Sequence, residues 1–177
     1  MKIGIISDTH TKVKLAKEAI DTLIEDGAEF IIHAGDIVEV ETLELLKNSN
    51  KRYVAVYGNN DAHLVAHHNE YNLVQEPYYF KLNDLKFKLM HLPFYMSNDA
   101  DIVVFGHTHT FDVELVKDTL FLNSGEVCAR SKPVSEFAML DISDKKYKVT
   151  HYTKKTDKKK KDGYKTKSFS FKRKKDD

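Results

Sequence analysis

Cysteine is almost absent from this 177-residue chain, in which Cys128 is the only one. A single thiol excludes an internal disulfide framework and is typical of a protein in a reducing compartment. No apolar run approaches the ~20 residues that a membrane-spanning helix needs. The opening residues, MKIGIISDTH, contain no apolar stretch long enough for a signal peptide. We therefore expect a soluble, cytoplasmic protein with no membrane segment.

A phosphate-binding loop of the form Gly-x-x-x-x-Gly-Lys-Ser/Thr is also missing, so a nucleotide-driven motor has no support. The composition is ordinary for a soluble protein, with 41% hydrophobic and 31% charged residues. A chain of this length can bury a substantial core, and it indicates one domain.

Lysine is concentrated in residues 154–177. This segment carries 12 Lys or Arg against 4 Asp, a charge of +8, and the overall charge of +1 leaves the preceding body at −7. Aliphatic side chains that could offset the entropy of ordering are almost lacking there. We predict a domain over residues 1–153 and a tail that is disordered from about Lys155. Its aromatic residues could contact nucleic acid through stacking among the lysines, and a solubilising extension is the alternative.

The first third of the chain predicts alternating strands and helices. Short apolar runs favour strands at 2–7, 30–33 and 52–57. Apolar residues at helical spacing favour helices over about 13–26 and 40–48. This β-α-β-α-β order implies parallel pairing with right-handed crossovers.

The remainder of the chain predicts strands and no strong helix. Asn83-Asp84 indicates a hairpin turn between two of them. The expected strands cover residues 78–82, 85–91, 102–105, 113–116, 120–122, 136–142 and 147–152. A β-α half followed by a β-rich half predicts two packed sheets with helices on the outside.

Seven side chains that can bind metals lie on five short loops, four of which directly follow a predicted strand. They are Asp8, His10, Asp36, Asn59, His91, His107 and His109. Because strands deliver their ends to one edge of a sheet, these residues can converge although they are distant in sequence. Carboxylates, imidazoles and an amide without a thiolate suit hard or borderline divalent ions. The pattern predicts a binuclear hydrolytic site.

Taken singly, most of these fragments have a structural explanation as well. Gly-Asp at 35–36 and Gly-Asn-Asn-Asp at 58–61 are typical of tight turns, and His91 alone suits a core histidine. Asp-Thr-His at 8–10 is a frequent accidental pattern. Gly-His-Thr-His at 106–109 is the most specific, because two imidazoles at one strand end would both need partners.

In this order the fragments resemble the calcineurin-like metallophosphoesterases, and the short chain resembles their small bacterial and archaeal phosphodiesterase branch. The resemblance covers about residues 1–152. It implies an α/β fold, a four-layer α/β/β/α sandwich of two mixed sheets. It also implies a hydrolase that uses two divalent ions, with Mn²⁺ expected first and Ni²⁺, Zn²⁺ or Fe²⁺ as alternatives. A metal-bridging hydroxide would then attack a small phosphodiester substrate.

The resemblance divides the ligands into two sets. One ion would be held by Asp8, His10, Asp36 and His109, and the other by Asp36, Asn59, His91 and His107. Asp36 belongs to both sets and would bridge the two ions.

The catalytic position that the resemblance implies is Asn60. Many members have a His there that assists protonation of the leaving group, and an asparagine cannot titrate. The loop after His91 also departs from the branch, which often has His-Gly-His where this chain reads His-Leu-Pro. Three further histidines could act on the leaving group, although surface positions are favoured for them: His63, His67 and His68.

Two other functions stay open at this point. A subunit of the retromer coat resembles this family in fold but uses its site for interactions, so a non-catalytic metal-binding scaffold is one alternative. All seven ligand positions carry side chains that can bind a metal ion, and this favours the enzyme over the scaffold. The other alternative is a nucleic-acid-associated protein that acts through its basic tail. The sequence leaves the substrate, the native metal and the oligomeric state open.

Overall fold

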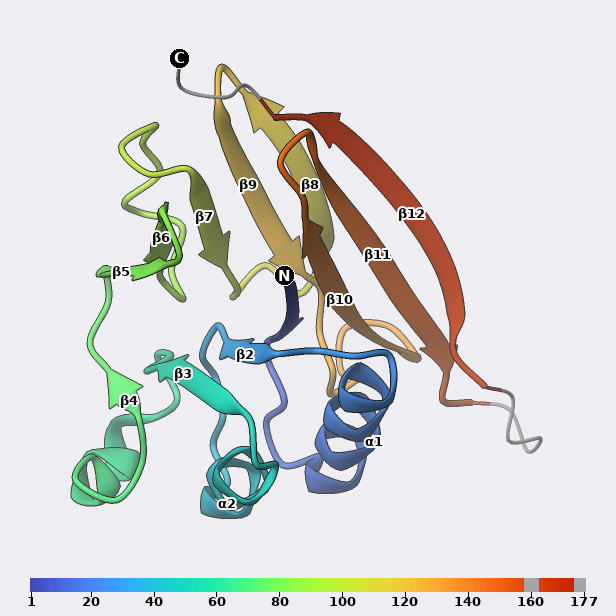
Figure 1. Ribbon diagram of the computed structural model, residues 1–177. Coiled ribbons are helices and arrows are strands. Elements are labelled where there is room, and N and C mark those ends of the chain that lie inside the picture. The colour runs from blue at the N-terminus through green and yellow to red at the C-terminus, as the bar shows by residue number, and fades with distance from the viewer. Residues whose placement is uncertain (158–162, 174–177) are drawn as a thin grey trace.

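The computed structural model describes residues 1–157 and 163–173, which form two mixed β-sheets packed face to face (Figure 1). The larger sheet has seven strands in the order β12-β11-β10-β1-β2-β3-β4. They are β1 (Lys2–Ile6), β2 (Phe30–His33), β3 (Arg52–Val56), β4 (Leu73–Val74), β10 (Val134–Ile142), β11 (Lys146–Lys155) and β12 (Lys165–Lys172). Strands β1, β2, β3 and β4 run parallel, and β10, β11 and β12 continue the sheet antiparallel.

The smaller sheet has five strands in the order β5-β6-β7-β9-β8. They are β5 (Tyr78–Leu82), β6 (Leu85–Leu89), β7 (Ile102–Phe105), β8 (Phe111–Val116) and β9 (Thr119–Ser124). Strands β6, β7 and β9 are parallel neighbours, and β5 and β8 pair antiparallel at the two sides. The hairpin predicted at Asn83-Asp84 joins β5 to β6, and Asn83 has the positive φ of 53° that such a turn needs.

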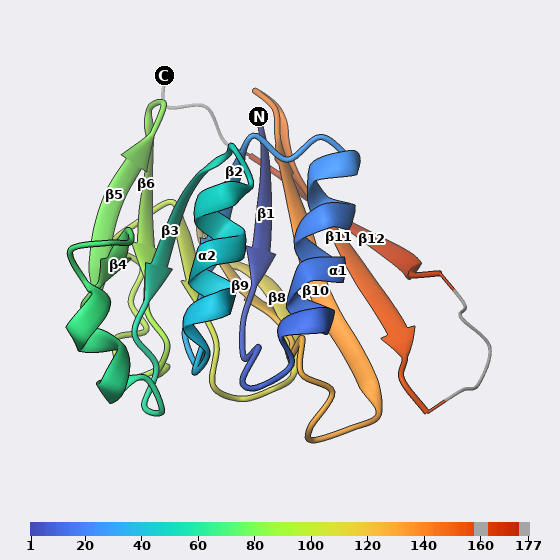
Figure 2. The same cartoon turned by 90° about the horizontal axis from the view of Figure 1, so that it is seen from below.

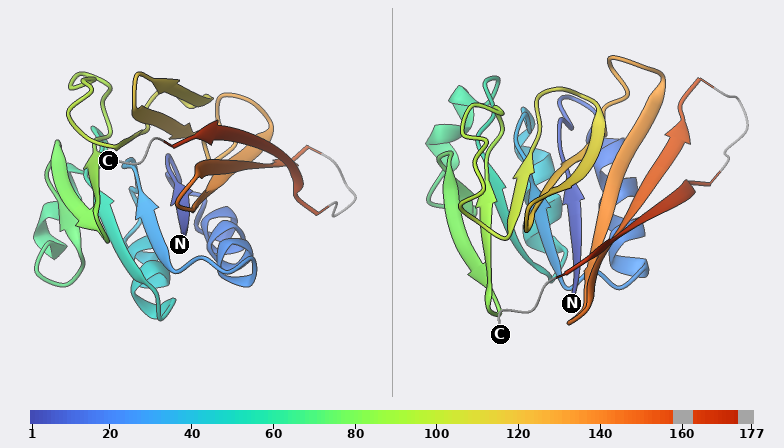
Figure 3. Two further views of the ribbon diagram at one scale, coloured as in Figure 1. Left: turned by 45° about the horizontal axis from the view of Figure 1, so that its top comes forward. Right: turned by 90° about the horizontal axis from the view of Figure 1, so that it is seen from above.

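Helices α1 (Val13–Glu25) and α2 (Val40–Asn48) lie on the outer face of the seven-stranded sheet, as Figures 2 and 3 show. A short 3₁₀ helix, η1 (Ala62–His67), follows β3. The outer face of the five-stranded sheet carries a small apolar cluster with Ala100, from the β6–β7 connection. The predicted α/β sandwich of two mixed sheets is confirmed. Among the described residues, no helix is long and apolar enough to cross a membrane.

The core between the sheets explains the strand pattern. Alternate residues of β1, such as Ile3 and Ile5, face the five-stranded sheet, where they meet residues such as Phe87 and Val104. Ile6, the residue after Ile5, packs with the helices on the other face. Because β1 is buried on both faces, its sequence reads as a continuous apolar run.

The parallel strands decide where the loops emerge. The carboxyl ends of β1, β2 and β3 lie at one edge of the seven-stranded sheet. Those of β6, β7 and β9 lie at one edge of the five-stranded sheet. Backbone hydrogen bonds such as Val127 N–H to Ser7 O, 3.0 Å, connect the two edges. The loops that carry the predicted ligands therefore meet.

The prediction of disorder from Lys155 onward is wrong for residues 165–172. They form β12, which pairs antiparallel with β11 along its whole length. Aromatic contacts hold this segment in place of aliphatic ones. The ring centroid of Phe169 lies 5.5 Å from that of Phe111, and the ring centroid of Tyr164 lies 4.6 Å from that of Phe137. The parts of the predicted tail at 158–162 and 174–177 lie outside the described residues. Nucleic-acid contact through this segment stays a prediction.

His33, at the end of β2, is fully buried and supports the loop between Asp8 and His10. Its Nε2 lies 3.0 Å from Thr9 Oγ1, and its Nδ1 accepts a hydrogen bond from Gly35 N–H at 3.2 Å. Burial lowers the pKa of His33 from 6.5 to about 3. The ring is therefore neutral in the folded protein near pH 7.

We expect His33 to make the fold less stable as the pH falls below about 6.5. In the unfolded chain His33 binds a proton below about pH 6.5, whereas in the folded chain it binds one only near pH 3. Protonation of His33 between these values therefore favours unfolding. The free energy of unfolding should fall by about 2 kcal/mol between pH 7 and pH 5 through this group. Urea denaturation of the wild type and of His33→Gln at both pH values measures it. An equal pH dependence in the two proteins would contradict this account.

Candidate metal centre

All seven residues that the sequence nominates as metal ligands lie at the shared edge of the two sheets. Five of them have a left-handed backbone although they are not glycine: Asp8 (φ 52°), His10 (42°), Asp36 (53°), His107 (66°) and His109 (58°). Such a conformation is uncommon outside glycine and clusters at functional sites. Hydrogen bonds between loops hold it, because Asp8 N–H donates to Gly35 O and His10 N–H to Asp36 O, both at 3.0 Å.

Two glycines allow these loops to approach each other. A Cβ at position 58 would lie 2.2 Å from the backbone nitrogen of Asp36, and one at position 106 would lie 2.2 Å from Ser7 Oγ. Neither distance is compatible with a side chain. The glycines that precede Asn59 and His107 are therefore needed for close approach of the backbone.

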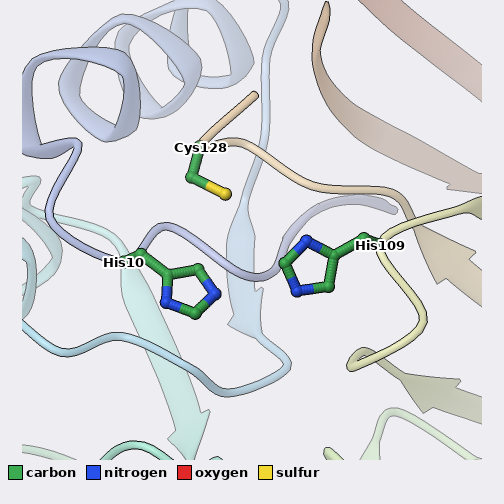
Figure 4. A group of neighbouring side chains, drawn as sticks. All are labelled: His10, His109 and Cys128. Carbon is green, nitrogen blue, oxygen red and sulfur yellow. The ribbon is translucent and has the colours of Figure 1, made fainter. Parts of the chain in front are cut away.

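Asp8, His10, Asp36 and His109 form the first set, whose ligand atoms all lie within 4.8 Å of one another. His109 Nε2 is 3.2 Å from Asp8 Oδ1, and His10 Nε2 is 3.6 Å from Asp36 Oδ2. The two imidazole rings are 5.4 Å apart between centroids, and Figure 4 shows them on either side of a common space.

Asn59, His91 and His107 form the second set together with Asp36. The amide oxygen of Asn59 lies 3.0 Å from His91 Nε2 and 3.1 Å from His107 Nδ1. His91 Nε2 is also 3.5 Å from Asp36 Oδ1, and the rings of His91 and His107 meet edge to face. These residues come from three separate loops, as predicted.

The carboxylate of Asp36 lies between the two sets. Its Oδ2 is the atom nearest His10, and its Oδ1 is the atom nearest His91. Asn60 fixes this orientation, because its backbone N–H donates to Oδ1 at 3.0 Å and its side-chain amide donates to Oδ2 at 2.7 Å. Asp36 thus offers one oxygen to each set.

Two buried polar atoms of the first set have no hydrogen-bond partner, Asp8 Oδ1 and His10 Nε2. The contact between Asp8 Oδ1 and His109 Nε2 does not have hydrogen-bond geometry. Unpaired buried polar atoms are costly, and a cation bound among them would satisfy both. The residues present therefore fit a divalent metal ion.

The charge states at neutral pH also suit metal binding. Burial raises the pKa of Asp36, but His91 and the two donors of Asn60 lower it more, so it lies below the ordinary value. Burial lowers the pKa of His10. Asp36 is consequently a carboxylate and His10 a neutral imidazole, which are the forms that coordinate metals. Burial raises the pKa of Asp8, although the hydrogen bond from Ser7 opposes this effect.

Groups behind the ligands orient them. Ser7 Oγ–H and His107 N–H donate to Asp8 Oδ2 at 2.6 and 3.2 Å, which leaves Oδ1 toward the site. His91 Nδ1 lies 2.8 Å from Ala34 O, and His109 Nδ1 lies 2.5 Å from Glu126 Oε2. His91 and His109 therefore turn Nε2 toward the carboxylates of Asp36 and Asp8.

The sequence interpretation missed the roles of Asp61 and Glu126. Asp61 is fully buried and accepts hydrogen bonds from three backbone N–H groups, at Gly58, Ile37 and Val38. It ties the loop of Asp36 to the loop of Asn59. Glu126 follows β9, the third parallel strand of the smaller sheet. A carboxylate just beyond a parallel strand was the available signal for Glu126.

Cys128 places a thiol beside the first set, within 4.8 Å of ligand nitrogens of His10 and His109 (Figure 4). Burial raises the pKa of this thiol to about 12, and the neighbouring Glu126 carboxylate adds to the effect. The thiol donates to Glu126 Oε2 at 3.3 Å. Cys128 is therefore a protonated packing residue near the site.

The other predicted histidines lie outside the ligand sets. His63 contacts Val38 O, His67 pairs with Glu70, and His68 contacts Val65 O. His63 and His68 are exposed, in agreement with the favoured surface interpretation.

Comparison with known proteins gives one family. A model of the calcineurin-like phosphoesterase superfamily domain matches residues 1–145. A phosphodiesterase from Methanocaldococcus jannaschii is 32% identical over 161 residues, which cover 84% of this chain and 97% of the relative. The solved structure of an archaeal phosphodiesterase is 31% identical, with a TM-score of 0.72 over 84% of this chain and 98% of the other. Vacuolar protein sorting 29 from Cryptosporidium parvum shares the fold, with 22% identity and a TM-score of 0.76 over 97% and 98% of the two chains.

Proposed function

We propose, since this chain belongs to the calcineurin-like phosphoesterase superfamily, that it is a metal-dependent phosphodiesterase with a binuclear site. The observation that carries the proposal is the position of Asp36. Its two carboxylate oxygens face two different sets of ligands, as a residue that bridges two cations requires. The archaeal relatives named as phosphodiesterases support diester substrates.

Each set of side chains would hold one divalent ion, and Mn²⁺ is the first choice. When bound, a pair of such ions supplies Lewis-acid stabilisation of the phosphoryl oxygens and a nucleophile derived from water. The protein holds the ligands in place and supplies negative charge through Asp8 and Asp36. Asn60 donates two hydrogen bonds to Asp36, and we assign it the role of holding the shared carboxylate.

Hydrolysis of bis(4-nitrophenyl) phosphate in the presence of Mn²⁺ tests this function. We expect release of nitrophenol that stops with a chelator and returns when Mn²⁺ is added. The monoester 4-nitrophenyl phosphate should react more slowly, because the proposal assigns the site to diesters. Protein that carries two metal ions per chain and leaves both esters intact would exclude the phosphodiesterase and favour an interaction scaffold on this fold.

Three exposed apolar residues, Phe94, Tyr95 and Met96, follow His91 of the second ligand set in the chain. Phe94 is 75% exposed and stands three residues after His91, a span of roughly 10 Å at most. The segment is fixed on both sides. Glu76 accepts hydrogen bonds from His91 N–H and Leu92 N–H, and Lys88 Nζ lies 3.1 Å from Asp99 Oδ1. Phe94 therefore exposes an aromatic ring only three residues after a proposed metal ligand, and we propose it as a contact for the organic part of the substrate.

Phe94→Ala is expected to raise KM for bis(4-nitrophenyl) phosphate about threefold to tenfold, with kcat changed less than about twofold. One aromatic contact stabilises a bound ring by about 0.5–1.5 kcal/mol. Methyl 4-nitrophenyl phosphate is the control substrate, because it has the same leaving group and no second ring. Steady-state kinetics on both esters measure the effect. An unchanged KM for the bis-aryl ester would remove Phe94 from the substrate site.

A further inference from the structure

Glu126 is a completely buried carboxylate in the loop between β9 and β10. Three consecutive backbone N–H groups surround it. Arg130 N–H donates to Oε2 at 3.1 Å, Ser131 N–H to Oε1 at 2.9 Å, and Lys132 N–H to Oε1 at 3.0 Å. Such a ring of backbone donors stabilises an anion without a cationic side chain. The loop therefore fixes both the charge and the position of this carboxylate.

Two side chains complete the environment of Glu126, the thiol of Cys128, which donates to Oε2 at 3.3 Å, and the ring of His109. His109 Nδ1 lies 2.5 Å from Oε2, so the ring carries its hydrogen on Nδ1 and donates it to the carboxylate. The opposite nitrogen, Nε2, then faces Asp8 Oδ1 at 3.2 Å with its lone pair available. Carboxylates placed behind a histidine in this way orient the ring and increase its basicity as a ligand.

Among the described residues, no carboxylate outside the ligand sets contacts the imidazole ring of His91 or His107, and the nearby Glu76 accepts from the backbone N–H of His91 instead. His91 Nδ1 is 2.8 Å from the backbone carbonyl of Ala34, which is neutral. His107 Nδ1 is 3.1 Å from the amide oxygen of Asn59, which is neutral and is itself a member of this set. The first set contains the carboxylates of Asp8 and Asp36 and is backed by a third, whereas the second set contains Asp36 alone.

We propose that Glu126 is a positioning residue that makes the first ligand set the tighter of the two metal positions. It does so by fixing the ring of His109 and by placing a negative charge behind it. This inference rests on the proposed function, because it requires that the two sets bind metal. It predicts that Mn²⁺ binds in two separate steps, with the first set occupied first.

Two pairs of variants test the proposal by calorimetric titration with MnCl₂. His107→Ala removes a ligand of the second set and isolates the first, and His10→Ala does the reverse. Adding Glu126→Gln to His107→Ala should weaken Mn²⁺ binding about tenfold or more, within the range known for such outer partners. Adding it to His10→Ala should change binding by less than about twofold.

Comparing the effect of Glu126→Gln in the His107→Ala protein with its effect in the His10→Ala protein separates a positioning role from a general loss of structure. If Glu126 only held the loop together, its substitution would weaken both sets alike, and that result would overturn the proposal. Asp141→Asn in the His107→Ala background is the matched control, since it removes one carboxylate at the opposite end of β1. Its effect should stay below about twofold. Failure of the unaltered protein to bind Mn²⁺ would instead contradict the proposed function itself.

A second measurement needs no variant and covers the case in which Glu126→Gln does not fold. The ¹⁵N chemical shifts of the His109 ring in the metal-free protein report which nitrogen carries the hydrogen. We expect a protonated Nδ1 and an unprotonated Nε2. The opposite tautomer would overturn the proposal whatever the titrations give.

Discussion

Asp36→Asn is expected to lower kcat for a phosphodiester by about a thousandfold or more, on the order of 4 kcal/mol. The physical reason is that one oxygen of Asp36 faces the first ligand set and the other faces the second. An asparagine offers one neutral oxygen, so it cannot neutralise and bridge two cations. Steady-state kinetics at saturating Mn²⁺ measure the loss, and elemental analysis should find fewer than two ions per chain.

Asp21→Asn is the matched control for this substitution. Asp21 is a half-exposed aspartate on α1, where it pairs with Lys17. Losing its charge should leave kcat within about twofold of the wild type. An Asp36→Asn protein that kept more than a tenth of the activity would show that a shared carboxylate is not needed.

Asp61→Ala is expected to lower the free energy of unfolding by about 3–5 kcal/mol. The substitution leaves three backbone N–H donors, those of Gly58, Ile37 and Val38, without their acceptor. Each buried donor that loses its partner costs about 1–3 kcal/mol. The same donors hold the loops of Asp36 and Asn59 together, so we expect activity to fall with stability. Urea denaturation followed by circular dichroism measures the change.

Two other variants serve as comparisons for the stability loss expected in Asp61→Ala. Asp61→Asn keeps one acceptor oxygen and should lose less stability than Asp61→Ala. Asp84→Ala alters an exposed residue in the turn between β5 and β6 and should change the free energy of unfolding by less than about 0.5 kcal/mol. If Asp61→Ala unfolded within 1 kcal/mol of the wild type, the three hydrogen bonds would not be what joins the two loops.

The sequence could predict which residues meet, because their convergence depends on strand direction. Asp8, Asp36 and Asn59 each follow one of three parallel neighbours, and a β-α-β-α-β order nearly always produces that pairing. His107 and His109 follow a fourth strand in the second sheet. Short apolar runs with polar residues directly after them therefore indicated that these side chains would lie close together, and their role as metal ligands is part of the proposed function.

Other features could not be predicted because they depend on contacts between distant residues. The place of Glu126 just beyond β9 marked it as a candidate, but its role depends on backbone donors at residues 130–132 and on His109, and no local pattern indicates these contacts. Strand β12 lacks aliphatic residues, and it is ordered by pairing with β11 and by the contact of Phe169 with Phe111. The lysine-rich composition of this segment indicated disorder, and composition could not show that β11 offers an edge with which the segment pairs.

The most direct test of the shared-carboxylate site is anomalous diffraction from crystals grown with Mn²⁺. We predict two manganese peaks about 3.5–4 Å apart, one on each side of the Asp36 carboxylate. The peak nearer His10 should be the stronger when Mn²⁺ is limiting. A solitary peak at saturating Mn²⁺, or peaks that do not contact Asp36, would contradict the account.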